Sequence, residues 1–70
     1  MTLLVTVNGA LRELAAGATV ASIVDELTGD RRGRGVAVAL GGEVVPRGAW
    51  SSTSLSDGAE IEVVQAVQGG

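Results

Sequence analysis

Residues 19–29 read "TVASIVDELTG" and carry the helical pattern around which the rest of the chain is arranged. The apolar side chains recur at i, i+3, i+4 and i+7, the spacing of one face of an amphipathic helix; they are Val20, Ile23, Val24 and Leu27. Thr19 is a suitable N-cap, and Gly29 is a natural C-terminal stop. We predict one helix of roughly ten residues, close to the usual length in globular proteins.

Two strands are predicted before this helix. Residues 3–9, "LLVTVNG", alternate in the period of a strand and end in Asn8-Gly9. Asn-Gly is the strongest short signal for a β-hairpin. The second strand is therefore expected around residues 11–14, and residues 15–18 are expected to form a loop.

Three further strands are predicted after the helix. Residues 36–40, "VAVAL", are apolar on both faces, which indicates a central strand. Gly41-Gly42 can form a tight turn into a fourth strand, which Pro46 should keep short or at an edge of the sheet. Residues 51–58 are predicted to be loop and turn, with Leu55 pointing inward. The last strand, 59–64, places Glu60 and Glu62 on one face and Ile61 and Val63 on the other.

The order of these elements predicts an α+β fold of the ubiquitin-like β-grasp type. A mixed sheet of about five strands needs a cover for its apolar face, and the one main helix can supply it. The segment that contains the helix is also a natural crossover between strands that no tight turn could join. We expect residues 1–66 to form this domain and residues 67–70 to form a flexible tail ending in Gly-Gly.

The composition excludes several classes of function. The 70 residues contain no Cys and no His, so nucleophilic catalysis of the Cys-His or Ser-His type and thiolate metal sites are excluded. A net charge of −3 argues against a nucleic-acid partner. The longest apolar run is far too short to span a bilayer, and no basic residue precedes the first strand as it would in a signal peptide. We expect a cytoplasmic protein with no membrane partner.

The loop after the helix, "GDRRGRG" at residues 29–35, leaves two interpretations open. Arg31, Arg32 and Arg34 could form a small basic patch, but cations beyond a helix C-terminus are also favoured by the helix dipole in an ordinary solvated loop. The second interpretation is preferred.

Several short motifs, taken in order, make the chain resemble a known family. They are "VNG" at 7–9, "TV" at 19–20, "VAVAL" at 36–40, "VVPRGAW" at 44–50, "LSDG" at 55–58, "IEVV" at 61–64 and the final "GG". Together they resemble the small sulfur carriers of thiamine biosynthesis, the ThiS group, over essentially the whole chain. "VPR" followed by Trp50 points to the thiamine branch. Ala59 departs from the acidic residue common after the "DG" turn, and Glu62 departs from the apolar surface that relatives offer to partners.

The resemblance implies that the protein is a substrate for other enzymes and has no catalytic residue, metal or bound cofactor of its own. The reacting group would be the carboxylate of Gly70, which an ATP-dependent adenylating enzyme activates. Sulfur from a persulfide-bearing donor then gives a thiocarboxylate, and a thiazole synthase takes the sulfur. Because Gly69 has no Cβ, the tail can enter a narrow cleft where a side chain would clash. The partner enzyme would recognise Gln68 and Val67 together with Gly69.

Four residues of the folded body are candidates for contact with these partners. Val64 lies on the predicted helix-free face with Glu62, although an ordinary exposed valine would look the same. Trp50, the only aromatic residue, is better explained as a core anchor than as a partner contact. Arg47 could form a surface ion pair or hold a partner's carboxylate.

Three rival functions remain compatible with the sequence. A sulfur carrier for molybdopterin synthesis would share the fold and the glycine pair, although "VPR" and Trp50 disfavour it. A ubiquitin-like modifier would share the activation chemistry; because the chain has no Lys, it could not form polymers through its own lysines. A plain interaction domain would make no use of Gly69 and Gly70.

Overall fold

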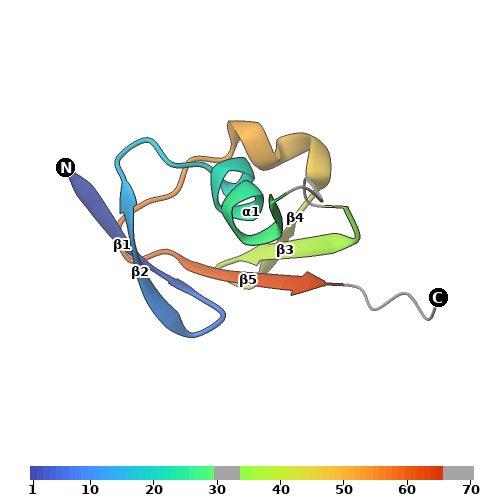
Figure 1. Cartoon of the computed structure of the whole chain (residues 1–70), viewed down its shortest axis with the longest axis horizontal. Helices are drawn as coiled ribbons and strands as arrows, with labels where there is room; N and C mark the ends of the chain where they lie inside the picture. The colour runs from blue at the N-terminus through green and yellow to red at the C-terminus, as the bar shows by residue number, and fades with distance from the viewer. Residues whose placement is uncertain (30–33, 66–70) are drawn as a thin grey trace.

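The last strand of the chain lies in the middle of the sheet (Figure 1). A computed structural model describes residues 1–29 and 34–65, and in this part the five strands are ordered β2-β1-β5-β3-β4. The elements are β1 (Thr2–Val7), β2 (Ala10–Ala15), α1 (Val20–Thr28), β3 (Val36–Leu40), β4 (Glu43–Val45), the 3₁₀ helix η2 (Arg47–Ser52) and β5 (Glu60–Gln65). β1 and β5 are parallel, while the other neighbours are antiparallel. The predicted mixed sheet is confirmed.

The first hairpin forms as the sequence predicts. β1 and β2 pair from Thr2↔Ala15 to Val7↔Ala10. Asn8 and Gly9 join them with φ angles of 52° and 84°, both in the left-handed region. Two positive φ angles define a type I′ turn, whose twist matches that of the flanking strands.

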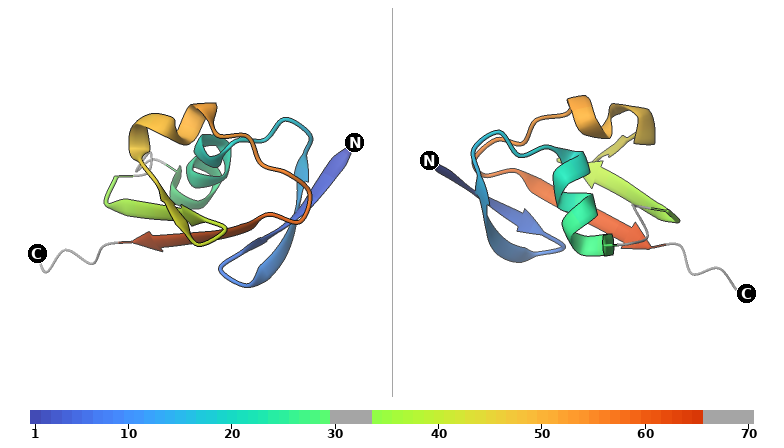
Figure 2. Two further views of the ribbon diagram at one scale, coloured as in Figure 1. Left: turned by 180° about the vertical axis from the view of Figure 1, so that it is seen from behind. Right: turned by 45° about the horizontal axis from the view of Figure 1, so that its top comes forward.

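The helix covers one face of the sheet and is capped as predicted (Figure 2). The Thr19 hydroxyl accepts a hydrogen bond from the Ser22 N–H, and the Ser22 hydroxyl accepts one from the Thr19 N–H. This reciprocal pair is a capping box in which Ser22 takes the place of the usual Glu or Gln. Gly29 ends the helix with φ of 57°.

One residue of the predicted apolar stripe is less buried than expected. Leu27 is 39% exposed, whereas Val20, Ile23 and Val24 are fully buried. Leu27 lies in the last turn of α1, beside a hollow of about 330 Å³ that Val63 and other residues line, so the sheet covers it incompletely. Thr28 is buried instead, and its hydroxyl donates to the Val24 carbonyl at 2.8 Å.

The core lies between the sheet and the two helices. Its buried apolar side chains come from every element except the short edge strand, and they are Val5, Val7, Leu14, Val20, Ile23, Val24, Val38, Trp50, Leu55 and Ile61. Leu55 is 6% exposed, which confirms that it points inward. Every buried side-chain nitrogen or oxygen of the described residues has a hydrogen-bond partner.

The second half of the chain differs from the prediction in two ways. β3 has a partner on each side, but the central strand of the sheet is β5. A 3₁₀ helix, η2, occupies residues 47–52, part of which was predicted to be loop. Pro46 begins it, since its carbonyl accepts from the Ala49 N–H at 2.8 Å, and the Thr53 hydroxyl donates to the Ala49 carbonyl at 2.6 Å. β4 is a three-residue edge strand, as Pro46 predicts.

Neither described helix, in residues 1–29 and 34–65, has the length and apolar character needed to cross a membrane.

Replacing Ile23 by Ala tests the placement of the core. Ile23 is fully buried, so the variant should lose about 2–5 kcal/mol of unfolding free energy through lost burial and a cavity. Leu27→Ala, in the same helix but 39% exposed, is the matched control and should lose less than half as much. Urea denaturation followed by circular dichroism measures both, and equal losses would contradict this packing.

Candidate functional site

The C-terminal end of β5 is the point from which the predicted reactive tail begins. Gln65 is the last described residue and pairs in register with Val36 of β3. Gly70, Gly69, Gln68 and Val67 lie outside the described residues, so their predicted roles and the boundary between domain and tail stay predictions. The structure therefore places the last described residue before the predicted tail at the end of an interior strand.

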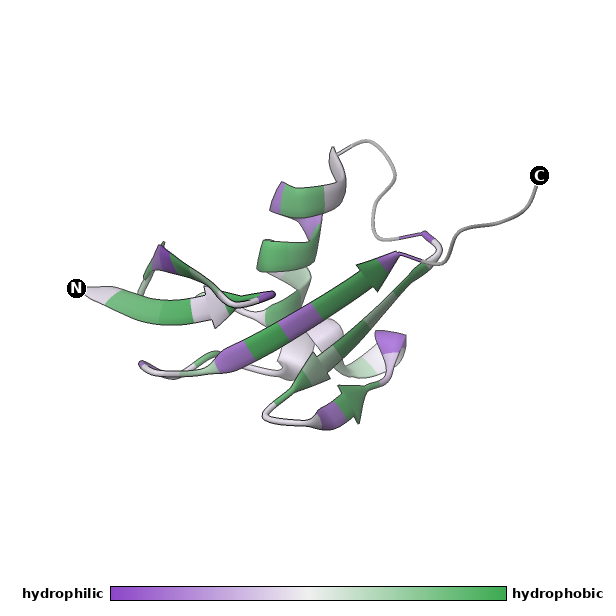
Figure 3. Ribbon diagram, turned by 90° about the horizontal axis from the view of Figure 1, so that it is seen from below, coloured by the Kyte–Doolittle hydropathy of each residue, from purple (hydrophilic) through white to green (hydrophobic). Residues whose placement is uncertain are grey.

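The sheet face opposite α1 is open beside this point (Figure 3). Val64 is 61% exposed and pairs with Ala37, while Glu62 pairs with Ala39, which in turn pairs with Val44. Residues paired across a sheet share one face, so these side chains are neighbours. Together with part of Val38 they line a shallow hollow of about 200 Å³. We name this surface the open-face patch: Ala37, Ala39, Val44, Glu62 and Val64.

The open face is apolar and acidic. In the first part of β5, hydrophilic and hydrophobic residues alternate (Figure 3). The exposed positions on this face are Glu60, Glu62 and Val64. Glu13 of β2 is exposed on the same open face, where it pairs with Leu4 of β1. Arg12 and Arg47, by contrast, contact Glu26 of α1 and Trp50 of η2 on the covered side of the sheet.

The four residues predicted as a partner interface separate into two groups. Glu62 and Val64 lie together on the open-face patch. Trp50 is 6% exposed in the core, and its indole N–H donates to the Val45 carbonyl at 2.9 Å. The Arg47 guanidinium lies over the Trp50 ring, 4.8 Å from its centroid, a cation–π contact that the sequence analysis did not predict. The structure therefore supports the core-anchor interpretation of Trp50, and contact of Trp50 or Arg47 with a partner stays a prediction.

Two residues of this region were not assigned to the site from sequence. Val44 is 77% exposed and completes the open-face patch. Its signal was the alternation in "EVV", which puts Val44 and Val45 on opposite faces of a half-covered sheet. Asn8 was assigned only to a turn, yet its side chain hydrogen-bonds the backbone of Val63 in β5.

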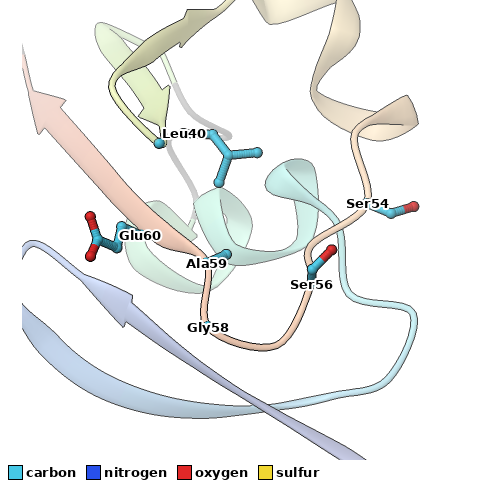
Figure 4. Close-up of a pocket in the computed structure, with 7 residues that line it drawn as sticks. Leu40, Ser54, Ser56, Gly58, Ala59 and Glu60 are labelled. Carbon is cyan, nitrogen blue, oxygen red and sulfur yellow. The ribbon is translucent and has the colours of Figure 1, made fainter.

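A larger hollow of about 360 Å³ lies elsewhere, at the beginning of β5 (Figure 4). Leu40, Ala59 and Glu60 line it together with Ser54, Ser56 and two glycines. Because β5 runs from Glu60 to Gln65, this hollow and the start of the tail lie at opposite ends of the strand. It brings none of the predicted site residues together. Among residues 1–29 and 34–65, no three Asp or Glu side chains gather as metal ligands would.

Comparison with known proteins identifies the family. The model of the ThiS family matches residues 5–70, which is nearly the whole chain. The chain belongs to the ThiS family. A curated relative, the sulfur carrier protein ThiS of Escherichia coli K12, is 35% identical over 63 residues, covering 90% of this chain and 92% of the relative.

A solved structure shows the same fold. The crystal structure of the thiamine biosynthesis protein ThiS from Geobacter metallireducens superposes with a TM-score of 0.79 and 30% identity, covering 97% of this chain and all of the other. The ThiS-family resemblance read from the sequence and the ubiquitin-like β-grasp fold are both confirmed.

Replacing Trp50 by Phe tests its assignment to the core. Phe cannot donate to the Val45 carbonyl, so the variant should lose about 1–3 kcal/mol of unfolding free energy. Arg47→Ala removes the stacked cation but keeps the indole, and should lose only about 0.5–1 kcal/mol. Thermal unfolding followed by circular dichroism compares the two. A larger loss in Arg47→Ala would show that the Arg47 side chain stabilises this corner more than the indole hydrogen bond does.

Proposed function

We propose that this ThiS-family chain is a sulfur carrier protein whose Gly70 carboxylate is adenylated and converted to a thiocarboxylate, which donates sulfur for thiazole formation in thiamine biosynthesis. The observation that carries this proposal is the family match up to residue 70, where the sequence has Gly69-Gly70. The name of the Escherichia coli relative, a sulfur carrier, supports it.

The chemistry follows from the properties of a carboxylate. Its carbon is a poor electrophile until one oxygen becomes part of a good leaving group. Transfer of AMP from ATP to the Gly70 carboxylate, with release of pyrophosphate, supplies this. The outer sulfur of a persulfide then displaces AMP to give an acyl disulfide, and a second thiol cleaves its S–S bond, releasing the thiocarboxylate and leaving a disulfide between the two thiol sulfurs. Because Gly69 and Gly70 lack a Cβ, the backbone can approach the nucleotide closely in a narrow cleft. The chain has no Cys, so the sulfur would be carried at the terminus alone.

In this proposal the protein is a co-substrate and not an enzyme. An adenylating enzyme of the ThiF kind supplies ATP chemistry, a persulfide-bearing protein supplies sulfur, and a thiazole synthase of the ThiG kind consumes it. The contribution of the carrier is to be recognised and to present its terminus. We propose that the open-face patch, with Val64 and Glu62 from the original prediction and Val44 added, is the docking surface.

The position of the open-face patch supports this assignment. Val64 precedes Gln65, and the remaining 66–70 segment can reach at most about 17 Å when fully extended. An enzyme that holds the terminus in its active site must therefore hold the body close to the end of β5. Exposed apolar side chains beside a carboxylate are the usual make-up of such a contact, with an apolar centre and a polar rim.

The intact mass of the protein tests the proposed chemistry. Incubation with ATP, a sulfide source and a ThiF-type enzyme should raise the mass by the replacement of one oxygen with sulfur. A form lacking Gly69 and Gly70 should show no gain. An unchanged mass in the full-length protein, while the enzyme loads a known carrier, would refute the proposal. Isopeptide adducts on other proteins would instead identify a modifier, and transfer of sulfur to a molybdopterin precursor would identify the other carrier branch.

Charged substitutions in the open-face patch test docking. Val44→Asp and Val64→Asp should each raise the KM for the carrier about tenfold, the effect of losing about 1.4 kcal/mol of binding, because the new carboxylate must be desolvated on docking. Leu11→Asp is the matched control, because Leu11 is 69% exposed on the same face but in the edge strand β2. Its KM should stay within twofold of wild type. An equal rise in all three variants would point to general charge repulsion instead of a local contact.

A further inference from the structure

The side chain of Asn8 continues the sheet where the backbone of β1 has left it. Up to this point the parallel ladder is regular, since the Thr6 N–H donates to the Ala59 carbonyl and the Asn8 N–H donates to the Ile61 carbonyl, both at 2.9 Å. At Asn8 the φ angle of 52° turns the chain into the hairpin. The next backbone groups of a continuing strand would have paired with Val63.

The carboxamide of Asn8 takes the place of those missing backbone groups. Its Oδ1 accepts from the Val63 N–H at 2.8 Å, and its Nδ2 donates to the Val63 carbonyl at 3.1 Å. A carboxamide carries one carbonyl acceptor and an N–H donor side by side, as a peptide group does. The last backbone pair between β1 and β5 is Val7↔Ile61, so Asn8 extends two-sided pairing of β5 by two residues toward the tail.

The turn itself does not require asparagine. Gly41-Gly42 makes a comparable turn between β3 and β4, with φ angles of 58° and 87° and no side chain at all. Type I′ turns accept Asn, Asp or Gly at the first position. Only Asn among these offers both a donor and an acceptor to Val63. Asparagine is therefore needed at position 8 for its two hydrogen bonds to Val63 of β5, and not for the turn.

We propose that Asn8 is a positioning residue for the C-terminal tail, and this inference rests on the proposed function. By holding Val63 in the sheet, Asn8 keeps Val64 on the open-face patch and fixes Gln65 as the point from which residues 66–70 start. If the end of β5 left the sheet, the docking residue Val64 and the start of the tail would move together. The enzyme would then have to order this segment before it could adenylate the terminus, and binding would weaken accordingly.

Two substitutions at Asn8 distinguish the effect of its side-chain hydrogen bonds from the effect of its turn conformation. Asn8→Gly keeps the positive φ without strain and removes both hydrogen bonds to Val63. Asn8→Asp also suits the turn and keeps the acceptor for the Val63 N–H, but has no donor for the carbonyl. Full-length proteins are compared by amide hydrogen exchange at Val63 and by kcat and KM for thiocarboxylate formation, using a ThiF-type enzyme, ATP and a sulfide source.

We expect Asn8→Gly to lower the exchange protection of Val63 and kcat/KM about fivefold to tenfold each, the effect of losing roughly one net hydrogen bond. The loss in kcat/KM should appear mainly as a higher KM. Asn8→Asp should lie between Asn8→Gly and wild type. Val64 should lose protection as well, though less than Val63. Its backbone groups keep their partner in β3, so they exchange faster only when the end of β5 leaves the sheet.

Asp57→Ala is the control for general destabilisation. The Asp57 carboxylate accepts from the Leu4 N–H at 2.7 Å, before the start of β5 and away from the tail. This variant also loses a hydrogen bond to the sheet, but its kcat/KM should stay within twofold of wild type. Wild-type kcat/KM in Asn8→Gly, or an equal loss in Asp57→Ala, would overturn the positioning role while leaving the carrier function intact. Failure of wild type to form a thiocarboxylate would overturn the proposed function, and this role with it.

Discussion

The parallel pairing of β5 with β1 is the constraint on which the rest of the structure depends. Parallel strands cannot be joined by a tight turn, so the chain between them must cross a face of the sheet, and α1 and η2 lie on that face (Figure 2). The pairing also gives β5 a partner on each side and leaves the edges to β2 and β4. The strand that leads toward the proposed reactive terminus is therefore an interior strand with a neighbour on each side.

The parts of the fold that sequence predicted correctly are those determined by nearby residues. The Asn8-Gly9 turn, the Thr19 cap and the stop at Pro46 each depend on contacts within a few positions. The errors depend on distant contacts. Leu27 has the right spacing for the core, but only the three-dimensional structure shows that the sheet does not fully cover it. Likewise η2 has no strong local signal, and its one large side chain, Trp50, is fixed by packing and by the Val45 carbonyl.

The candidate site was predicted in part for the same reason. Alternation along β5 was enough to place Glu62 and Val64 on one face. The alternation could not show that Val44, twenty positions earlier, lies in the same patch. A local hydrophobic pattern does not determine which strands are neighbours in the sheet. The second role of Asn8 was harder still to predict from the sequence. Its partner, Val63, is 55 positions away, and the turn it forms explains the residue well enough to hide its second role.

The distribution of charge suits a protein that must leave its partners as well as find them. Glu13, Glu60 and Glu62 lie on the open face, whereas Arg12 is engaged with Glu26 on the covered side. Exposed charges of one sign accelerate encounter with a partner of opposite charge and add little to the final affinity. A proposed carrier that is loaded by one enzyme and unloaded by another needs fast association and fast release. In the proposed function a small apolar patch beside acidic side chains would favour both, and the covalent chemistry at the terminus, rather than tight docking, would determine whether sulfur is passed to the next enzyme.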